Sequence, residues 1–159
     1  MTVVSNTSPL SYLVLIEHVE VLPALFGTVV IPETVRDELS HEAAPPVLRQ
    51  WIASPPSWLV VRPNVEGQDA DLMRLDPGER DAIALAEHSR ADLVIIDERA
   101  ARDVARARGL TVTGLLGVLA AASQRGLIDL PEAVDRLRQT SFRASPRLLK
   151  DLLERYARE

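Results

Sequence analysis

The sequence predicts an α/β fold of three layers, with helices on both faces of a central, mostly parallel sheet. Short apolar runs, many of them β-branched, alternate along the chain with longer segments of helical spacing, and this alternation is typical of parallel strands joined by crossover helices. The run Leu93–Ile96 is apolar at every position, as expected for a strand that is buried on both faces of its sheet.

The first half of the chain is predicted to hold three strands, at residues 3–5, 28–31 and 59–61, the last of them minor or at an edge. Helical spacing predicts helices at residues 10–17, 32–40 and 47–52. Ser8 is the expected N-cap of the first helix, because Pro9 follows it at the position where a helix best accepts proline. Residues 63–76 are polar and acidic, which predicts a surface connection.

The second half continues the alternation and then becomes entirely helical. Strands are expected at residues 93–96 and 110–112, and helices at residues 77–86, 98–108, 115–124, 131–139 and 146–157. Because the chain has no internal repeat or linker, residues 1–159 are expected to form one domain, with a core at 2–128 and C-terminal helices at 130–157. The apolar stripe of these last helices either covers the core, which we favour, or forms a dimer or partner surface.

Composition excludes several kinds of functional site. The chain has no cysteine, which rules out a disulfide framework, a thiolate metal site and a cysteine nucleophile. Its three histidines, His18, His41 and His88, lack paired ligand spacing, so any metal is expected to be Mg²⁺ or Mn²⁺ bound by oxygen. No basic leader precedes the first strand, and no apolar run approaches the roughly 20 residues of a membrane span. A cytoplasmic protein without membrane contact is therefore expected.

Polar side chains flank the ends of three predicted strands, where ligands bind in open parallel sheets. Asn6 follows the first strand, Asp97 follows the most apolar one, and Glu38 lies in the helix after the second strand. Glu79 stands in the first turn of the helix before the Asp97 strand, two residues ahead of Asp81. Acids gathered at one sheet edge repel one another unless a cation or a proton relieves them. The set therefore predicts a site for a hard divalent metal.

Each acid also has an ordinary structural explanation. Glu38 fits a solvated helix face, Glu79 a partner of the helix dipole, and Asp97 an N-cap of the following helix. Asp81 and Glu98 point either toward the site or away from it. The net charge of −5 argues against binding of nucleic acid by the whole surface. It is compatible with a nuclease, because metal-binding carboxylates count as negative until the metal arrives.

Several segments together resemble the PIN-domain family, and most of all the small prokaryotic members related to VapC-type toxins. The likeness runs in order through most of residues 2–128 and is carried by Ser5–Leu10, Ile31–Leu39, Leu75–Ala86, Leu93–Asp97 and Gly109–Leu119. The resemblance implies a five-stranded parallel α/β sandwich and a ribonuclease that depends on Mg²⁺ or Mn²⁺. For a toxin it also implies an antitoxin partner and a homodimer.

The resemblance assigns the acidic positions of the family to Asn6, Glu38, Glu79 and Asp97, and its small hydroxyl residue to Ser8. Asp81 competes for the third position, and Glu79 is preferred because it stays in register when Asp97 and the helix before it are aligned without gaps. The first position departs from the family pattern. An amide oxygen can bind Mg²⁺ but brings no charge, so metal affinity should fall.

Under this hypothesis Asp97 and Glu79 are the principal metal ligands, and Asn6 completes the coordination. Glu38 binds a second ion or orients the attacking water. Arg99 and Arg102, one helical turn apart, either contact the RNA backbone or form a solvated helix face.

Two other functional hypotheses imply a different chemistry from that of a nuclease. A PIN fold that lost metal affinity through Asn6 would act as a binding module, without catalysis. A receiver-like phosphotransfer domain is disfavoured, because it needs a pair of acids after the first strand and a lysine after a later one. Asn6 brings no such pair, and Lys150 is the only lysine of the chain.

Overall fold

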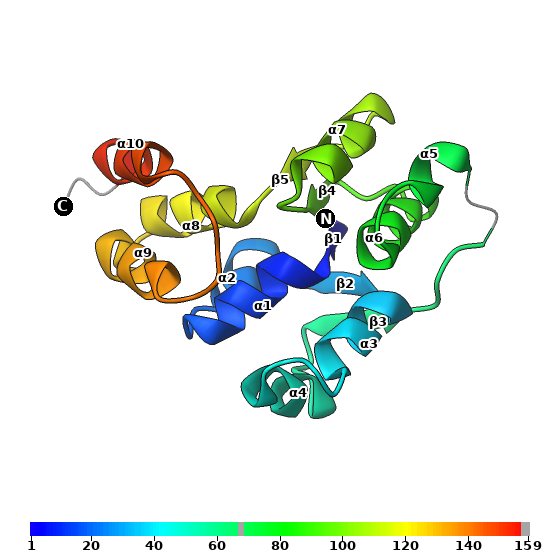
Figure 1. The fold of residues 1–159 in the computed structure, drawn as a ribbon, viewed down its shortest axis with the longest axis horizontal. Coiled ribbons are helices and arrows are strands. Elements are labelled where there is room, and N and C mark those ends of the chain that lie inside the picture. The colour runs from blue at the N-terminus through cyan, green and yellow to red at the C-terminus, as the bar shows by residue number, and fades with distance from the viewer. Residues whose placement is uncertain (67–68, 157–159) are drawn as a thin grey trace.

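The computed structural model describes residues 1–66 and 69–156, and its centre is a five-stranded sheet in which all strand pairs are parallel. The strands follow the spatial order β3-β2-β1-β4-β5 (Figure 1). Their bounds are Val3–Ser5 for β1, Val29–Pro32 for β2, Leu59–Arg62 for β3, Leu93–Ile95 for β4 and Val112–Thr113 for β5. All five predicted strands are present, and the third lies at an edge as predicted.

Helices cover both faces of this sheet, which confirms the predicted three layers (Figure 1). One face, represented by Val4, Val94 and Ile96, packs against α5 (Ala70–Met73), α6 (Pro77–His88) and α7 (Arg99–Ala107). The other face, represented by Val3 and Ile95, packs against the remaining helices. These are α1 (Thr7–Leu15), α2 (Val21–Phe26), α3 (Glu33–Ser40), α4 (Pro46–Ala53), α8 (Leu115–Gln124), α9 (Leu130–Arg138) and α10 (Pro146–Tyr156).

The start of the first helix differs from the prediction. Helix α1 begins at Thr7, and Asn6 rather than Ser8 is its N-cap, with extended backbone angles of φ −83° and ψ 175°. Pro9 therefore occupies the third helical position. A proline is tolerated there because the N–H groups of the first turn have no partner within the helix.

Other boundaries shift by one or two residues, and two short helices were not predicted. Helix α2 is six residues long and contains Pro23, so its apolar spacing gave no periodic signal. Helix α5 interrupts the predicted surface connection 63–76, of which residues 67 and 68 lie outside the described residues. Residue 157, the predicted end of the last helix, also lies outside them. No helix in the described ranges is long and apolar enough to cross a membrane.

The strand order places a crevice at the carboxyl ends of β1 and β4. From β1 the chain moves outward through β2 and β3, and then returns to the other side of β1 with β4 and β5. Parallel sheets bind ligands where the strand order reverses in this way. Ser5 of β1 is paired with Ile95 of β4, and the Asn6 N–H donates to the Ile95 carbonyl oxygen at 3.0 Å. The residues that follow both strands therefore emerge side by side.

Candidate active site

A cleft of about 690 Å³ lies beyond the carboxyl ends of β4 and β5. Four acids line it: Asp76, Glu79, Asp97 and Glu98. Ser8 and Arg102 line it as well. Of the residues that the sequence singled out, five therefore lie at this one cleft: Ser8, Glu79, Asp97, Glu98 and Arg102.

Asp97 joins the end of β4 to the start of α8. Its Oδ1 accepts the Leu115 N–H at 2.7 Å, so Asp97 binds the first residue of α8, and the N-cap position of α7 falls to Glu98. Its Oδ2 is buried and has no hydrogen-bond partner among the described residues. Burial raises the pKa of Asp97, while the Leu115 N–H and the charge of Arg102 partly oppose this shift. Gly114 makes this approach possible, because an added Cβ would lie 2.9 Å from Asp97 Oδ1.

Glu79 lies in the first turn of α6, and its side chain is only 7 % exposed. The Asp76 side chain accepts the Glu79 N–H at 3.1 Å, which is the capping-box arrangement of a helix start. Burial raises the pKa of Glu79 to about 7, and the neighbouring charges of Asp76 and Glu98 add to the shift. A carboxylate held in this way is relieved either by a proton or by a cation.

Asn6 lies buried directly after β1, with 5 % of its surface exposed. Its Oδ1 is a second buried oxygen that lacks a hydrogen-bond partner in the described part of the chain. Buried acceptors without partners are rare, and an ion or a water is a common explanation. Asn6 and Asp97 follow two paired strands, and amide and carboxylate oxygens such as theirs, with the Glu79 carboxylate, are of the kind that a hard divalent cation prefers.

Glu38 approaches the same region from α3 and is held by two other elements. Thr7 Oγ1, at the start of α1, donates a hydrogen bond to Glu38 Oε1. The carboxylate also rests against Gly78 of α6, where an added Cβ would lie 3.0 Å from Glu38 Cδ and closer still to Oε1. Because Thr7 follows Asn6 and Gly78 precedes Glu79, these contacts bring Glu38 to the neighbourhood of both residues.

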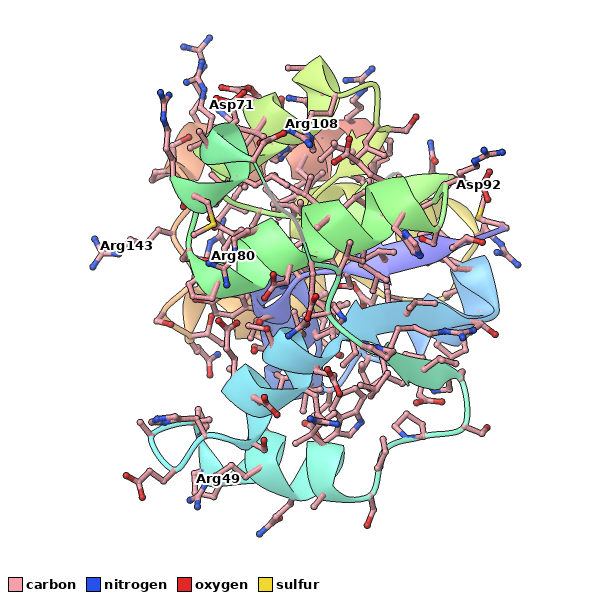
Figure 2. The ribbon with its side chains drawn as sticks, turned by 90° about the vertical axis from the view of Figure 1, so that its right-hand side faces the viewer. Arg49, Asp71, Arg80, Asp92, Arg108 and Arg143 are labelled. Atoms are coloured by element: carbon pink, nitrogen blue, oxygen red, sulfur yellow. The ribbon has the colours of Figure 1, made fainter. Side chains whose placement is uncertain are left out.

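Asp81 lies on the α3 side of α6 and does not line the cleft. Its Oδ2 accepts from Thr34 Oγ1 at 2.5 Å, and its Oδ1 accepts from Arg80 Nε at 3.3 Å. Figure 2 looks onto α6, with Arg80 labelled on this helix. The side chain of Asp81 is therefore engaged in holding α3 and α6 together. Arg99 is exposed and also lies outside the cleft.

The predicted site residues converge, but their side chains do not form a complete coordination sphere. Within residues 1–66 and 69–156, no group of three or more histidine or carboxylate side chains is arranged to hold a metal ion. Glu79 and Asp97 share the cleft, Asn6 is buried where its backbone N–H meets the end of β4, and Glu38 contacts Thr7 and Gly78, the neighbours of Asn6 and Glu79. The assignment of these four residues as ligands stays a prediction.

Sequence reasoning missed Thr7 and Asp76. The Asp76-Pro77-Gly78-Glu79 pattern is a recognisable capping box with proline at the first helical position, so a signal for Asp76 existed. Thr7 carried no comparable signal, because its partner Glu38 lies 31 residues further along the chain.

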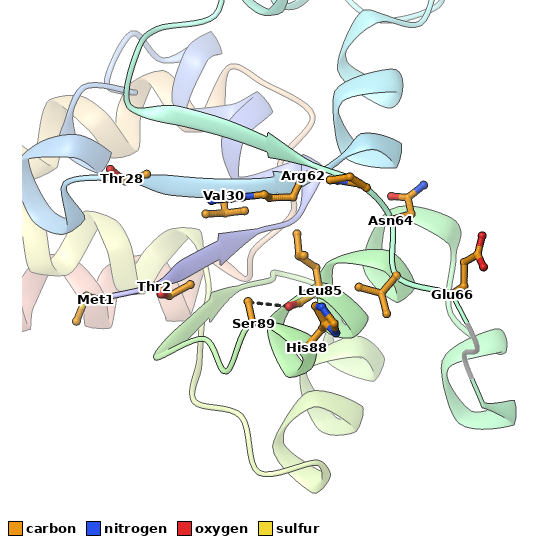
Figure 3. Close-up of a pocket in the computed structure, with 12 residues that line it drawn as sticks. Met1, Thr2, Thr28, Val30, Arg62, Asn64, Glu66, Leu85, His88 and Ser89 are labelled. Atoms are coloured by element: carbon orange, nitrogen blue, oxygen red, sulfur yellow. Dashed lines mark hydrogen bonds between the residues drawn. The ribbon is translucent and has the colours of Figure 1, made fainter.

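A second and larger cleft, of about 870 Å³, lies elsewhere on the molecule (Figure 3). Apolar side chains such as Val30 and Leu85 line it, and Glu66 is its sole acid among the described residues. Its Ser89 hydroxyl is bonded to the Leu85 carbonyl oxygen at 2.7 Å. This cleft lacks the paired acids that a divalent metal requires, so the smaller acidic cleft is the better candidate for chemistry.

Replacing Gly78 by alanine is expected to displace Glu38 and to leave the fold nearly unchanged. The added Cβ meets the carboxylate end of a flexible side chain, which can rotate away at the loss of its bond to Thr7. If Glu38 takes part in the chemistry of the cleft, the nuclease activity that the sequence predicts should fall by about 100-fold, in keeping with the displacement of one positioned group. A melting temperature within a few degrees of the wild-type value would show that packing survives. Wild-type activity of this variant would contradict a role for Glu38.

Comparison with known proteins gives one result. A family model described as a PIN domain matches residues 2–158. This span contains every residue discussed above, and it includes the two C-terminal helices α9 and α10. No curated protein and no solved structure matches the chain.

Proposed function

The chain belongs to the PIN-domain family, whose fold is of the nuclease type, and we propose that it is a metal-dependent ribonuclease that hydrolyses RNA phosphodiester bonds. PIN domains generally bind RNA and use divalent metals. The observation that carries the proposal is the pair of buried oxygens that lack a partner among the described residues, Asn6 Oδ1 and Asp97 Oδ2, together with Glu79, a carboxylate that lines the same cleft as Asp97 and whose pKa is raised to about 7. A cation is the ligand that would relieve all three groups at once.

We assign Asp97, Glu79 and Asn6 as the residues that would hold Mg²⁺ or Mn²⁺. Such an ion supplies an activated water and neutralises charge on the phosphate. The protein supplies the geometry. Asp97 is oriented by the Leu115 N–H, and Asn6 by strand pairing.

Glu38 and Arg102 complete the proposed machinery. Glu38, oriented by Thr7, either holds a second ion or orients the attacking water through a hydrogen bond. Arg102 lines the cleft near Asp97, where its guanidinium can bind a phosphate oxygen of the substrate.

The resemblance to VapC-type toxins extends the proposal to a cytoplasmic toxin that works as a homodimer and is controlled by an antitoxin protein. Light scattering is expected to give a particle of twice the mass of the chain. A monomer at micromolar concentration would contradict the homodimer while leaving the nuclease proposal untouched.

Cleavage of a mixed-sequence single-stranded RNA tests the proposed activity. The wild-type protein should cleave the RNA with Mn²⁺ or Mg²⁺ and stop when EDTA is added. Millimolar Mn²⁺ should also raise the melting temperature, because a ligand that binds only the folded state stabilises it. A well-folded protein that neither cleaves RNA nor gains stability from Mn²⁺ would instead be a binding module, with metal affinity lost through Asn6.

A further inference from the structure

One wall of the acidic cleft comes from the far end of the chain. The connection between α9 and α10 contributes Ser141, Phe142, Arg143 and Ala144 to the lining, together with Asp76, Glu79 and Asp97. We call residues 140–144 the strap. Figure 1 shows this connection, in orange, running from α9 past α8 to α10.

The strap is held in place by the helix that follows Asn6. The Tyr12 hydroxyl of α1 is hydrogen-bonded to Ser141 Oγ at 3.0 Å, and the Tyr12 and Phe142 rings meet edge to face, with centroids 5.2 Å apart. Within the strap, the Phe142 N–H donates to Thr140 Oγ1 at 3.2 Å. The strap therefore has a fixed position relative to the site residues at the end of β1.

Two features of this wall suit a nucleotide. The chain has six aromatic residues, and two of them, Tyr12 and Phe142, line this one cleft. Both residues are half-buried, and because their rings stand 80° apart, a base can stack on one of the two rings at a time. Arg143 is exposed and makes no ion pair or hydrogen bond with any described residue, and its side chain extends away from the body of the molecule (Figure 2).

The charged side chains that line the cleft are mostly acids, so an exposed arginine at its edge matters for binding a polyanion. Asp76, Glu79, Asp97 and Glu98 repel a polyanion, and in the described residues only Arg102 and Arg143 bring positive charge to the lining. Arg102 lies close to Asp97, which partly neutralises its positive charge. Arg143 has no such neighbour among the described residues, so it is the arginine free to attract a phosphate at the rim.

We infer that the strap is a substrate-binding element, in which Phe142, held by Tyr12, stacks a base of the RNA and Arg143 binds a phosphate of the RNA at the rim of the cleft. The inference rests on the proposed ribonuclease function and adds residues that the acidic motifs do not identify. Phe142 and Arg143 bind substrate in this assignment, and the chemistry stays with the residues at the strand ends.

Binding and cleavage are measured separately to test this assignment. Binding is followed by fluorescence anisotropy of a labelled single-stranded RNA of about ten nucleotides, with Ca²⁺ in place of Mn²⁺ to slow cleavage. Phe142→Leu keeps an apolar side chain but removes the ring, and should weaken binding by about 5- to 10-fold. Arg143→Gln should weaken binding at low salt and lower the slope of log K against log salt by about 0.7, the value for one phosphate contact on a single strand.

Arg147→Gln is the matched control, because Arg147 is exposed on the first turn of α10 and does not line the cleft. It should leave both the affinity and the salt slope unchanged. In cleavage assays, Arg143→Gln should raise KM and keep kcat, as expected for a residue that binds the ground state and the transition state equally. Tyr12→Phe retains both rings but releases Ser141, and serves as a second probe if Phe142→Leu lowers the melting temperature.

The outcomes separate this inference from the proposed function. Wild-type cleavage together with unchanged RNA affinity in the Phe142 and Arg143 variants would overturn the strap assignment and leave the ribonuclease standing. RNA binding that depends on the strap, without any cleavage, would support the strap and overturn the ribonuclease. A wild-type protein that neither binds nor cleaves RNA would overturn both.

Discussion

Replacing Asp97 by asparagine is expected to lower metal-dependent RNA cleavage by at least about 100-fold, or about 2.7 kcal/mol in the barrier. The substitution keeps an oxygen that can accept the Leu115 N–H, so the link between β4 and α8 should survive. It removes the negative charge that the unpartnered Oδ2 would offer to a metal. Because burial already raises the pKa of Asp97, the metal-free variant should be at least as stable as the wild type at pH 8.

Asp92→Asn provides the matched control for this experiment. Asp92 precedes the same strand at its other end, where it accepts the Thr2 N–H at 2.6 Å, and Figure 2 shows it on the opposite side of the molecule from Arg80. It should retain wild-type activity. Equal activity in wild type and Asp97→Asn, both free of contaminating nuclease, would remove Asp97 from the reaction.

Glu79 is expected to make the metal-free protein less stable as the pH rises. Its folded-state pKa of about 7 lies above its ordinary value of 4.5, so its protonated form is favoured in the folded state. The stabilising contribution is complete below about pH 4.5 and is lost as the pH rises through 7. Between pH 5 and pH 8, the free energy of unfolding of the wild type should therefore fall by about 2 kcal/mol relative to that of Glu79→Gln. This corresponds to about 4–8 °C in melting temperature.

Thermal unfolding in EDTA across this pH range measures the difference. Glutamine can still serve in the capping box, so the two proteins should be equally stable near pH 5 and diverge above it. Glu42→Gln changes an exposed acid, and its melting temperature should depend on pH in the same way as that of the wild type. Adding Mn²⁺ at pH 8 should raise the melting temperature of the wild type more than that of Glu79→Gln. Parallel profiles of wild type and Glu79→Gln would mean that Glu79 titrates as an ordinary exposed acid.

The layers and the strands of this fold were predictable because the sheet is buried on both faces. The wholly apolar run Leu93–Ile96 predicts its strand, and the turn and capping residues around Pro77 predict the start of α6. The start of α1 was predicted wrongly. Ser8 and Pro9 resemble a helix start, yet the pairing of Asn6 with the Ile95 carbonyl oxygen fixes where β1 ends, so the helix begins directly after Asn6. Tertiary hydrogen bonding overrode a local preference.

The site was predictable to the extent that strand ends determine it. Asn6 and Asp97 follow paired strands, and a capping box positions Glu79. Sequence alone left open which way the Asp81 side chain points, because one turn of a helix holds both Glu79 and Asp81. Only the packing of α3 against α6 brings Asp81 into contact with Thr34. The strap could not be predicted either, since the contact between Tyr12 and Ser141 spans 129 residues.

The pairing of β1 with β4 also bears on when the site comes into existence. The two strands that bring Asn6 and Asp97 together lie about 90 residues apart in the chain, and contacts between such distant segments form late because a long loop must close first. A chain that is still being synthesised has no site until Asp97 and the segment after it have emerged and β4 has docked. The pairing of these strands thus ties any activity at the crevice to the docking of β4, a step that follows the synthesis of Asp97.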